Sequence, residues 1–288
     1  MSSFDQTVGD GCLVLDSPHS GHDYPDDFDH ACPRLALRQA EDNHVERLFD
    51  FAPSLGASLV LARFPRSYID PNRAADDIDT RMLDAPWPGT ARPSAKVHLG
   101  KGLIWRMLDD GTPIYARSLG VAEVQARIDR CWRPYHQAVH TALQAARRRH
   151  AAVLHLNCHS MPASSAAFSS DFPGLVHADF VLGDRDGSSA APALTAWIAA
   201  WLRAKGFTVS VNHPYKGVEL VRLHGQPHDG QHAIQFEVNK RLYMDEASLA
   251  PHDGFAGLRA VLYELLQALP AQVSTLGARA THGQSLAH

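Results

Sequence analysis

The sequence is poor in several features that would point to particular classes of protein. It has only four cysteines and no CxxC pair, so neither a disulfide framework nor a cysteine-based metal site is expected. Its formal net charge is −4, which lacks the basic surplus that nucleic acid or an anionic membrane would attract. No apolar run approaches the roughly 18 residues of a membrane span, and Met1 to Gly11 lacks the basic start and apolar core of a signal peptide. We therefore expect a reduced, cytoplasmic protein without a nucleic-acid or membrane partner.

Apolar residues make up 45% of the chain, which is enough for a sizeable core. Short apolar runs bounded by turn residues predict strands at 12–15, 58–64, 152–156, 180–182, 208–211 and 233–238. Apolar stripes at helical spacing predict helices around 45–52, 121–143, 194–202 and 255–265. Pro134 should kink or break the second of these helices. Strands that alternate with helices favour an α/β fold in three layers, with a largely parallel or mixed central sheet and helices on both faces.

The chain shows no internal repeat and no linker that divides it, so we expect one domain over residues 1–270. An irregular insertion is expected around 74–112, where Pro86, Pro88 and Pro93 interrupt any regular element. Long irregular loops are usually functional, as lids or binding loops. Residues 271–288 are small and polar, and the sequence predicts a flexible tail there. The oligomeric state does not follow from the sequence.

Two histidines stand where predicted strands end, and they suggest a metal site. His19 follows the strand at 12–15, and His159 follows the strand at 152–156. Open α/β sheets place their chemistry at the carboxyl ends of strands, and neutral imidazole is the commonest protein metal ligand. A catalytic zinc needs a third protein ligand, and Glu41 or Asp42 could provide it. Alternatively, both acids only stabilise the start of the following helix through its dipole.

A metal hydrolase also needs a general base near the metal-bound water, and Glu237 is the candidate. Glu237 interrupts the apolar run 233–238, and charged residues are seldom buried without a partner. Alternatively, simple alternation would turn Gln235 and Glu237 toward solvent on an edge strand.

A further cluster follows the predicted strand 58–64 and suggests an acidic substrate. It contains Arg66, Asn72 and Arg73. Arginine binds a carboxylate bidentately, and asparagine adds a neutral donor. Alternatively, Arg73 forms a surface ion pair with Asp70, or with Asp76 and Asp77.

Two nucleophile chemistries compete with the metal interpretation. Cys158 beside His159 suggests a thiol nucleophile, but neighbouring residues of a strand point to opposite faces. Ser20 and Ser160 lack the G-x-S-x-G turn of serine hydrolases. Both alternatives are therefore weaker than the metal site.

Taken together, the ordered motifs over residues 10–268 resemble the N-formylglutamate amidohydrolase (deformylase) family. They are Pro18-His19-Ser20-Gly21, Asp42 with His44-Val45, Arg66 with Asp70-Pro71-Asn72-Arg73, Trp132-Arg133-Pro134-Tyr135-His136, Cys158-His159-Ser160-Met161-Pro162, Pro214-Tyr215-Lys216-Gly217 with Arg222, and Gln235-Phe236-Glu237-Val238-Asn239. This family is similar to the zinc carboxypeptidases and to the aspartoacylase and succinylglutamate desuccinylase group. The resemblance implies one Zn²⁺ per chain and a small-molecule substrate with carboxylate groups.

The resemblance also implies a role for each matching residue. The zinc ligands would be His19, Asp42 and His159, and the general base would be Glu237. The substrate-binding residues would be Asn72 and Arg73, with Arg66 and Arg222 as further carboxylate or oxyanion partners. The implied reaction is hydrolysis of N-formyl-L-glutamate to formate and L-glutamate. Another N-acyl amino acid or a small peptide is the alternative substrate, and a non-catalytic binding protein is the alternative from another class.

The sequence departs from the family pattern at two positions. Asn157 stands where the family usually has Asp, two residues before the second histidine. An Asp there would orient or tune a ligand, whereas Asn keeps the shape and loses the charge. Val218 stands where the family tends to have a second glycine, which would narrow the approach beside Arg222. Catalytic strength and substrate choice depend on how the protein accommodates these changes.

Overall fold

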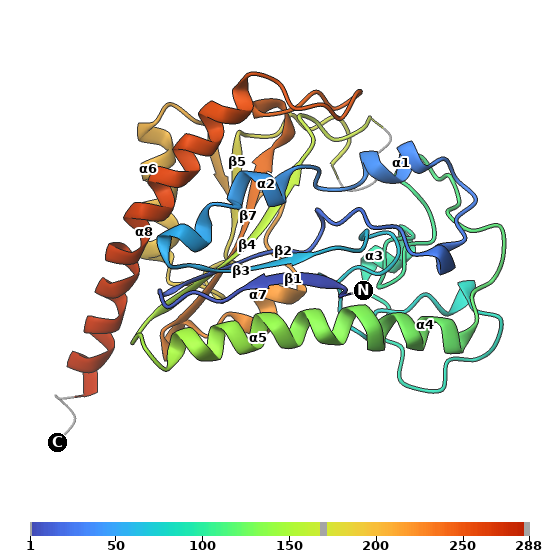
Figure 1. Ribbon diagram of the computed structural model, residues 1–288, viewed down its shortest axis with the longest axis horizontal. Coiled ribbons are helices and arrows are strands. Elements are labelled where there is room, and N and C mark those ends of the chain that lie inside the picture. Colours follow the sequence, from blue (N-terminus) through green and yellow to red (C-terminus); the bar gives the residue numbers. More distant parts are fainter. Residues whose placement is uncertain (1, 168–171, 285–288) are drawn as a thin grey trace.

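The centre of the fold is a pair of long parallel strands, β4 (Val153–Met161) and β7 (Gln231–Asn239), in which every side chain is buried. The computed structural model describes residues 2–167 and 172–284 (Figure 1). In both strands, polar residues alternate with apolar ones. Because successive side chains of a strand point to opposite faces, most of the polar residues of β4 and β7 share one face of the sheet. This shared polar face of β4 and β7 carries the candidate site.

The remaining strands complete one mixed sheet in the order β1-β3-β2-β4-β7-β5-β6. They are β1 (Phe4–Thr7), β2 (Leu13–Ser17), β3 (Ser58–Ala62), β5 (Phe180–Gly183) and β6 (Val209–Val211). Strands β3, β2, β4 and β7 are mutually parallel, whereas β1 is antiparallel to β3 and β5 is antiparallel to β7. The expected largely parallel or mixed sheet is confirmed. Strand β1 was not predicted, because its sequence FDQT is mostly polar and it lies at the exposed edge.

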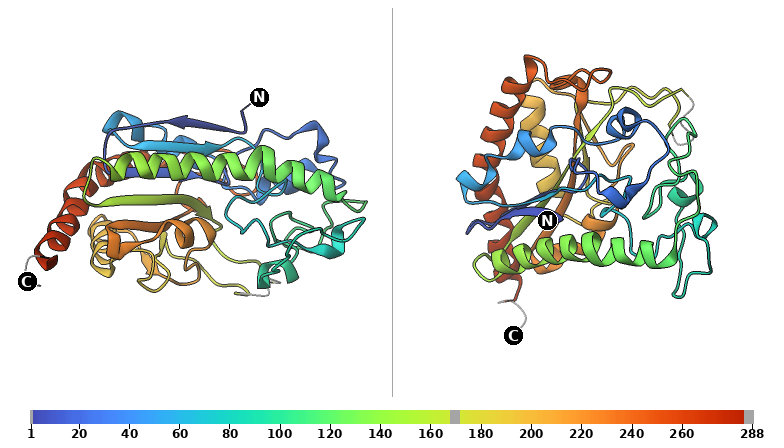
Figure 2. Two further views of the ribbon diagram at one scale, coloured as in Figure 1. Left: turned by 90° about the horizontal axis from the view of Figure 1, so that it is seen from below. Right: turned by 45° about the vertical axis from the view of Figure 1, so that its right-hand side comes forward.

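Helices cover both faces of the sheet, which confirms the three-layer arrangement (Figures 1 and 2). One face packs against α5 (Arg133–Arg147) and α7 (Glu219–His224), and the other against α2 (Val45–Phe49), α6 (Pro192–Ala204) and α8 (Gly254–Gln284). The shorter helices α1 (Arg34–Gln39), α3 (Ala95–His98) and α4 (Val121–Arg127) lie in the connecting segments. Among the described residues, no helix is long and apolar enough to cross a membrane.

The predicted break at Pro134 is replaced by a widened turn in a continuous helix. Helix α4 passes through one π-helical turn, Ile128–Trp132, directly into α5, and Pro134 lies in the first turn of α5. Proline lacks an N–H group and its ring collides with the carbonyl four residues earlier. A π turn loosens the hydrogen-bond ladder at this place, so the helix can continue.

Two segments outside the sheet were expected to be irregular. Residues 74–112 contain only a 3-10 turn, Thr80–Met82, and the short helix α3. The flexible tail predicted after Pro270 is instead helical, since α8 continues through this proline to Gln284. The buried side chain of Val273 packs this extension against the core. Residues 285–288 of the predicted tail lie outside the described residues.

Candidate active site

A cavity of about 620 Å³ opens at the carboxyl edge of the parallel strands. Open α/β sheets bind ligands at this edge, because the loops that follow parallel strands converge there. Strands β2, β3, β4 and β7 each supply side chains from their carboxyl ends or from the loops that follow. The cavity wall includes Asp42, Arg66, Arg73, His159 and Glu237.

Three buried side chains, His19, Asp42 and His159, meet beside this cavity, and two of them, Asp42 and His159, form part of its wall. One ligand atom from each lies within 4.8 Å of the others. Asp42 Oδ2 is 2.9 Å from Nδ1 of His159 and 3.5 Å from Nδ1 of His19. Four ligands placed tetrahedrally around zinc at its usual bond lengths are separated by about 3.3 Å. The cluster therefore has the spacing and the donor types to hold a metal ion.

One further observation favours a ligand at this place. Nδ1 of His19 is buried and has no hydrogen-bond partner among the described residues. A buried polar atom without a partner is costly, and an absent ligand is one explanation for it. The residues present therefore fit a metal ion on chemical grounds as well as by spacing.

Local backbone contacts bring Asp42 to the histidines. The N–H of Asp42 donates to the carbonyl of His19 at 3.1 Å, which ties the segment before α2 to the exit of β2. The neighbouring Glu41 turns away, and its carboxylate binds Tyr24 and Arg38 instead. Of the two acids considered as a third ligand, the structure thus places Asp42 in the cluster and Glu41 outside it.

The second ring nitrogen of each histidine, on the side of the ring away from Asp42, also has a hydrogen-bond partner. Nε2 of His19 is 2.7 Å from Asp70 Oδ1, and Nε2 of His159 is 2.7 Å from the side-chain oxygen of Asn157. These partners leave both Nδ1 atoms directed at Asp42, as in metal sites whose histidines are oriented by outer hydrogen bonds. Burial alone would raise the pKa of Asp70, but His19 and Arg66 hold it well below its usual range.

Glu237 lies beside the cluster, on the adjacent strand. It pairs with His159 in the register of β4 and β7, and only 6% of it is exposed. Since β7 is a central strand, the alternative in which Gln235 and Glu237 face solvent on an edge is wrong. Gln235 donates to Glu237 at 2.7 Å, and burial, aided by the charge of Asp42, raises the pKa of Glu237 to about 8. Glu237 can therefore accept or release a proton near neutral pH.

Arg66 and Asn72 line the cavity, and their polar groups hold the site together. Arg66 lies 3.6 Å from Asp42 Oδ1 and 3.3 Å from Asp70 Oδ2. The side-chain amide of Asn72 donates toward Gln235 at 3.4 Å, and its oxygen accepts from the backbone of α7 at 3.0 Å.

Arg73 differs from Arg66 in its partners. Its guanidinium donates only to backbone carbonyls, those of Lys101 at 3.0 Å and Asn72 at 3.1 Å. No carboxylate of the described residues forms an ion pair with it, so the expected alternative of a surface pair with Asp70 is wrong. Asp70 and Asp77 act on the charge of Arg73 only from beyond ion-pair distance. A buried guanidinium on a cavity wall that forms no ion pair within the protein can bind the carboxylate of a ligand.

Arg222 does not join the other predicted residues. It lies on α7, outside the cavity lining, and forms a two-armed ion pair with Glu219 at 2.8 Å for each arm. Val218, the second departure from the family pattern, lines the cavity in this region. Its backbone N–H donates to Gln235 at 3.2 Å.

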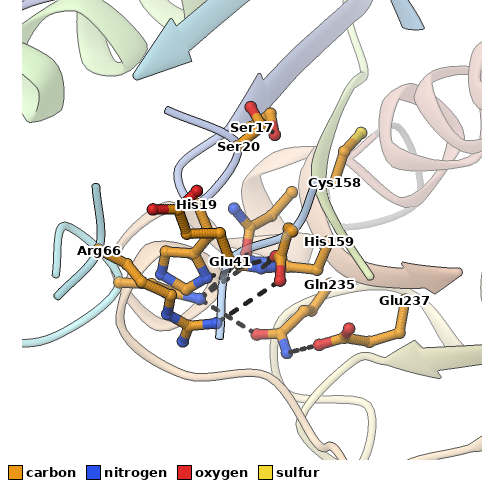
Figure 3. Close-up of polar contacts among 12 residues, drawn as sticks. Ser17, His19, Ser20, Glu41, Arg66, Cys158, His159, Gln235 and Glu237 are labelled. Carbon is orange, nitrogen blue, oxygen red and sulfur yellow. Dashed lines mark hydrogen bonds and ion pairs between the residues drawn. The ribbon is translucent and has the colours of Figure 1, made fainter. Parts of the chain in front are cut away.

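The competing nucleophiles are not supported by the geometry. Figure 3 shows His159 turned toward His19, whereas Cys158 points away from both. Burial raises the pKa of the Cys158 thiol well above its usual range, so it is not a reactive thiolate. Ser20 accepts a hydrogen bond from Ser17 at 2.8 Å rather than pairing with a histidine.

The structure adds residues that the sequence interpretation missed. Lys240 lines the cavity just after β7, and its buried ammonium donates to the backbone carbonyl of Glu41 at 2.6 Å. In the sequence, the position of Lys240 at the end of a predicted strand was the one signal that could have identified it. Asp70 was considered only as a surface partner of Arg73, yet it is buried.

Comparison with known proteins gives one consistent family. The sequence profile of the family described as N-formylglutamate amidohydrolase matches residues 11–244. The N-formylglutamate deformylase of Pseudomonas aeruginosa is 32% identical over 266 residues, which cover 90% of this chain and 92% of that protein. The corresponding protein of Pseudomonas putida is 29% identical with the same coverage. The crystal structure of N-formylglutamate amidohydrolase from Ralstonia eutropha JMP134 superimposes with a TM-score of 0.90 at 44% identity, over 95% of this chain and 99% of that one. The chain therefore belongs to the N-formylglutamate amidohydrolase family.

Proposed function

We propose that this protein hydrolyses the amide bond of N-formyl-L-glutamate and releases formate and L-glutamate. The observation that carries the proposal is the buried group of His19, Asp42 and His159 with Glu237 beside it, in a cavity at the carboxyl edge of the sheet. Relatives named N-formylglutamate deformylase match nearly the whole chain and supply the substrate. The partner is thus a small molecule with carboxylate groups.

We further propose one Zn²⁺ per chain, held by Nδ1 of His19, Nδ1 of His159 and a carboxylate oxygen of Asp42. A zinc ion in such a site polarises the scissile carbonyl and lowers the pKa of bound water to about 7. Asp70 and Asn157 keep the two imidazoles in the orientation that this requires, since each binds the Nε2 atom on the far side of the ring.

Glu237 is the proposed general base. It removes a proton from the attacking water as the water oxygen bonds to the formyl carbon. It then delivers that proton to the nitrogen as the C–N bond breaks, so that glutamate leaves with a neutral amine. A pKa of about 8, raised by burial and by Asp42, suits a group that must both accept and return a proton.

Arg73 is the proposed partner of a substrate carboxylate, supported by Asn72. Its guanidinium forms no ion pair with a carboxylate of the described residues, whereas Arg66 lies within ion-pair distance of both Asp42 and Asp70. When Arg73 binds the substrate carboxylate, the formyl group is fixed relative to Glu237. Binding energy is thereby used to orient the reacting atoms.

The test is the Glu237→Gln variant, which keeps the size of the side chain and removes the base. Formate release from N-formyl-L-glutamate should fall by about 10²- to 10⁴-fold, the usual contribution of a general base. Zinc content, measured by atomic absorption, should stay at the parental level, since Glu237 is not a proposed ligand.

Two controls define what would contradict the proposal. N-formyl-L-aspartate and N-acetyl-L-glutamate, assayed in parallel, test the amino acid and the acyl group separately. A Glu237→Gln variant that releases formate at nearly the parental rate would remove Glu237 from the mechanism. A parent enzyme that binds zinc but prefers another substrate would keep the metal site and reject N-formyl-L-glutamate.

A further inference from the structure

The irregular segment 74–112 contributes a lysine, Lys101, to the wall of the cavity. We propose that Lys101 binds the side-chain carboxylate of the substrate, and that Asp109 binds the same ammonium when no substrate is present. The inference rests on the proposed function, because it takes a substrate with two carboxylates and assigns the one that Arg73 does not hold. It makes this segment a part of the active site that determines specificity.

The cationic side chains on the cavity wall differ in what they already bind. Arg66 lies between two aspartates, and the buried ammonium of Lys240 donates to two backbone carbonyls. Lys101 instead forms an ion pair with the carboxylate of Asp109, which also lines the cavity. A carboxylate within the protein is therefore already the ligand of this ammonium.

The two partners of this ion pair differ in exposure. The side chain of Lys101 is 18% exposed, whereas that of Asp109 is 62% exposed. Asp109 lies in a turn that is closed by a hydrogen bond from Gly111 to Leu108 at 3.1 Å, and Leu108 is buried. Exposed side chains change rotamer within nanoseconds, and an ion pair with an exposed partner contributes little stability. Asp109 can therefore release the ammonium without any movement of the turn.

Lys101 itself is held in place at the cavity wall. Its backbone forms an antiparallel bridge with Trp105, and its ammonium lies 5.2 Å from the centre of the Trp105 ring. Trp105 is buried, and its ring N–H donates to Asp70 at 3.2 Å. A cation is attracted to the face of a tryptophan ring, so the ammonium should stay at the wall when Asp109 leaves it.

The position of Lys101 relative to Arg73 fits an N-acylated glutamate. The guanidinium of Arg73 donates to the backbone carbonyl of Lys101 at 3.0 Å, so the two residues are neighbours on one wall. Arg73 follows Asn72, whose amide lies 3.1 Å from His159, whereas Lys101 pairs with a residue that is exposed to solvent. Arg73 therefore suits the α-carboxylate, which is bonded to the same carbon as the formamide nitrogen. Lys101, farther from the reacting atoms, suits the side-chain carboxylate.

The pairing with Asp109 gives the site a preference for ligands with two carboxylates. Asp109 neutralises Lys101 in the empty cavity, so a ligand must displace it. A ligand with one carboxylate competes with Asp109 only at its concentration in solution. A dicarboxylate that is already bound by Arg73 presents its second carboxylate at a high effective concentration. Only the second kind of ligand replaces Asp109 efficiently.

The experiment compares N-formyl-L-glutamate with N-formyl-L-glutamine, in which an amide replaces the side-chain carboxylate. Lys101→Met removes the charge but keeps an unbranched side chain beside Trp105 and the backbone carbonyl that Arg73 uses. It should lower kcat/KM for N-formyl-L-glutamate by about 10- to 100-fold, the size of one charge-assisted contact, and change kcat/KM for N-formyl-L-glutamine by less than about three-fold. Lys101→Arg should restore most of the preference for glutamate.

Asp109→Asn tests the second half of the inference. It should lower KM for N-formyl-L-glutamate by about two- to five-fold, since the competing carboxylate is removed. The gain should vanish when Lys101→Met is combined with it, because both changes act on one contact. Lys205→Met is the matched control, since Lys205 also pairs with an acid, Glu264, and lies 5.1 Å from the ring of Trp201, but outside the cavity lining. It should leave both substrates at the parental rates.

Two results would overturn the inference. One is an equal loss for both substrates in Lys101→Met, which would make Lys101 a support for Arg73. The other is a Lys101→Met variant that keeps the parental preference for glutamate. A parent that releases formate from neither substrate would reject the proposed function. Calorimetric binding of L-glutamate and L-glutamine then decides the role of Lys101: weaker binding of glutamate alone in Lys101→Met supports it, and a parent that binds neither overturns it as well.

Discussion

At the scale of single residues, the three arginines near the cavity differ most in what already neutralises them. Arg66 lies between two aspartates, and Arg222 is bound by Glu219 outside the cavity lining. Arg73 contacts only backbone carbonyls. A charge-assisted hydrogen bond contributes about 1.5 to 3 kcal/mol, and an arginine that forms no ion pair within the protein can give more of this to a substrate than one that does.

Replacing Arg73 therefore has a predictable cost. Arg73→Gln should raise KM for N-formyl-L-glutamate by roughly 10- to 100-fold, which corresponds to losing one charge-assisted carboxylate contact. Arg222→Gln should leave KM within about two-fold, since its partner is Glu219. Steady-state formate release by both variants makes the comparison. A larger effect from Arg222 than from Arg73 would show that the substrate reaches α7 and that Arg73 is structural.

The residues that sequence reasoning found share a recognisable signal, and those it missed had an ambiguous one. His19 and His159 stand at strand ends, and Glu237 interrupts an apolar run. Lys240 closely follows an apolar run, but a lysine at the end of a strand is usually exposed to solvent. Arg222 was included because of the family pattern, and only the fold reveals its partner on the same helix.

At the scale of elements, β7 carries a histidine that makes the sheet sensitive to acid. His232 is buried, and its Nδ1 accepts from the backbone N–H of Ala191 at 3.3 Å. Burial, and secondarily the charge of Arg147, lowers its pKa to about 4. The unfolded chain, with a histidine pKa of about 6.5, binds more protons than the folded protein between these values. His232 therefore removes stability as the pH falls from about 6.5 toward 4.

His232→Asn tests this contribution, since asparagine keeps an acceptor near the position of Nδ1 and cannot titrate. Urea unfolding at pH 7.5 and at pH 5.0 should show that the parent loses more stability on acidification than the variant. The comparison within each protein cancels any packing change that is common to both pH values. Equal losses in parent and variant would mean that His232 is not protonated on unfolding in this range.

Elements with strong patterns were predictable, and those that depend on tertiary contacts were not. The buried runs that became β2, β4 and β7 and the apolar stripes of α5 and α6 are visible in the sequence. Strand β1 has almost no apolar signal and exists because β3 offers it an edge. A flexible tail was predicted after Pro270, yet α8 continues past this proline and the buried Val273 packs against the core.

At the scale of the whole molecule, a metal held between β2, β4 and the segment before α2 should tie distant parts of the chain together. Zinc that binds only the folded protein stabilises it by about 2.7 kcal/mol at a free concentration of 100 times Kd. For a chain of this size the melting temperature should rise by roughly 4 to 5 °C. Thermal unfolding in zinc and in chelator measures the shift.

The matched variants for this measurement are His159→Ala and His140→Ala. The first removes a proposed ligand and should abolish the zinc-dependent shift. The second removes an exposed histidine of α5 that lies outside the cluster and outside the cavity lining, so the shift should persist. A shift that survives His159→Ala would indicate zinc bound elsewhere.

The order of strands in the sheet also has a consequence for how the protein is made. Strands β2 and β4 are neighbours in the sheet, where Leu13 pairs with Leu154, although these two residues are far apart along the chain. At the usual 5 to 20 residues per second, the ribosome needs roughly 7 to 28 s to supply β4 after β2. During that interval β2 presents an unpaired, apolar edge, the kind of surface that recruits other chains. A strand that helps to build the cavity is therefore also one that needs protection from other chains during synthesis.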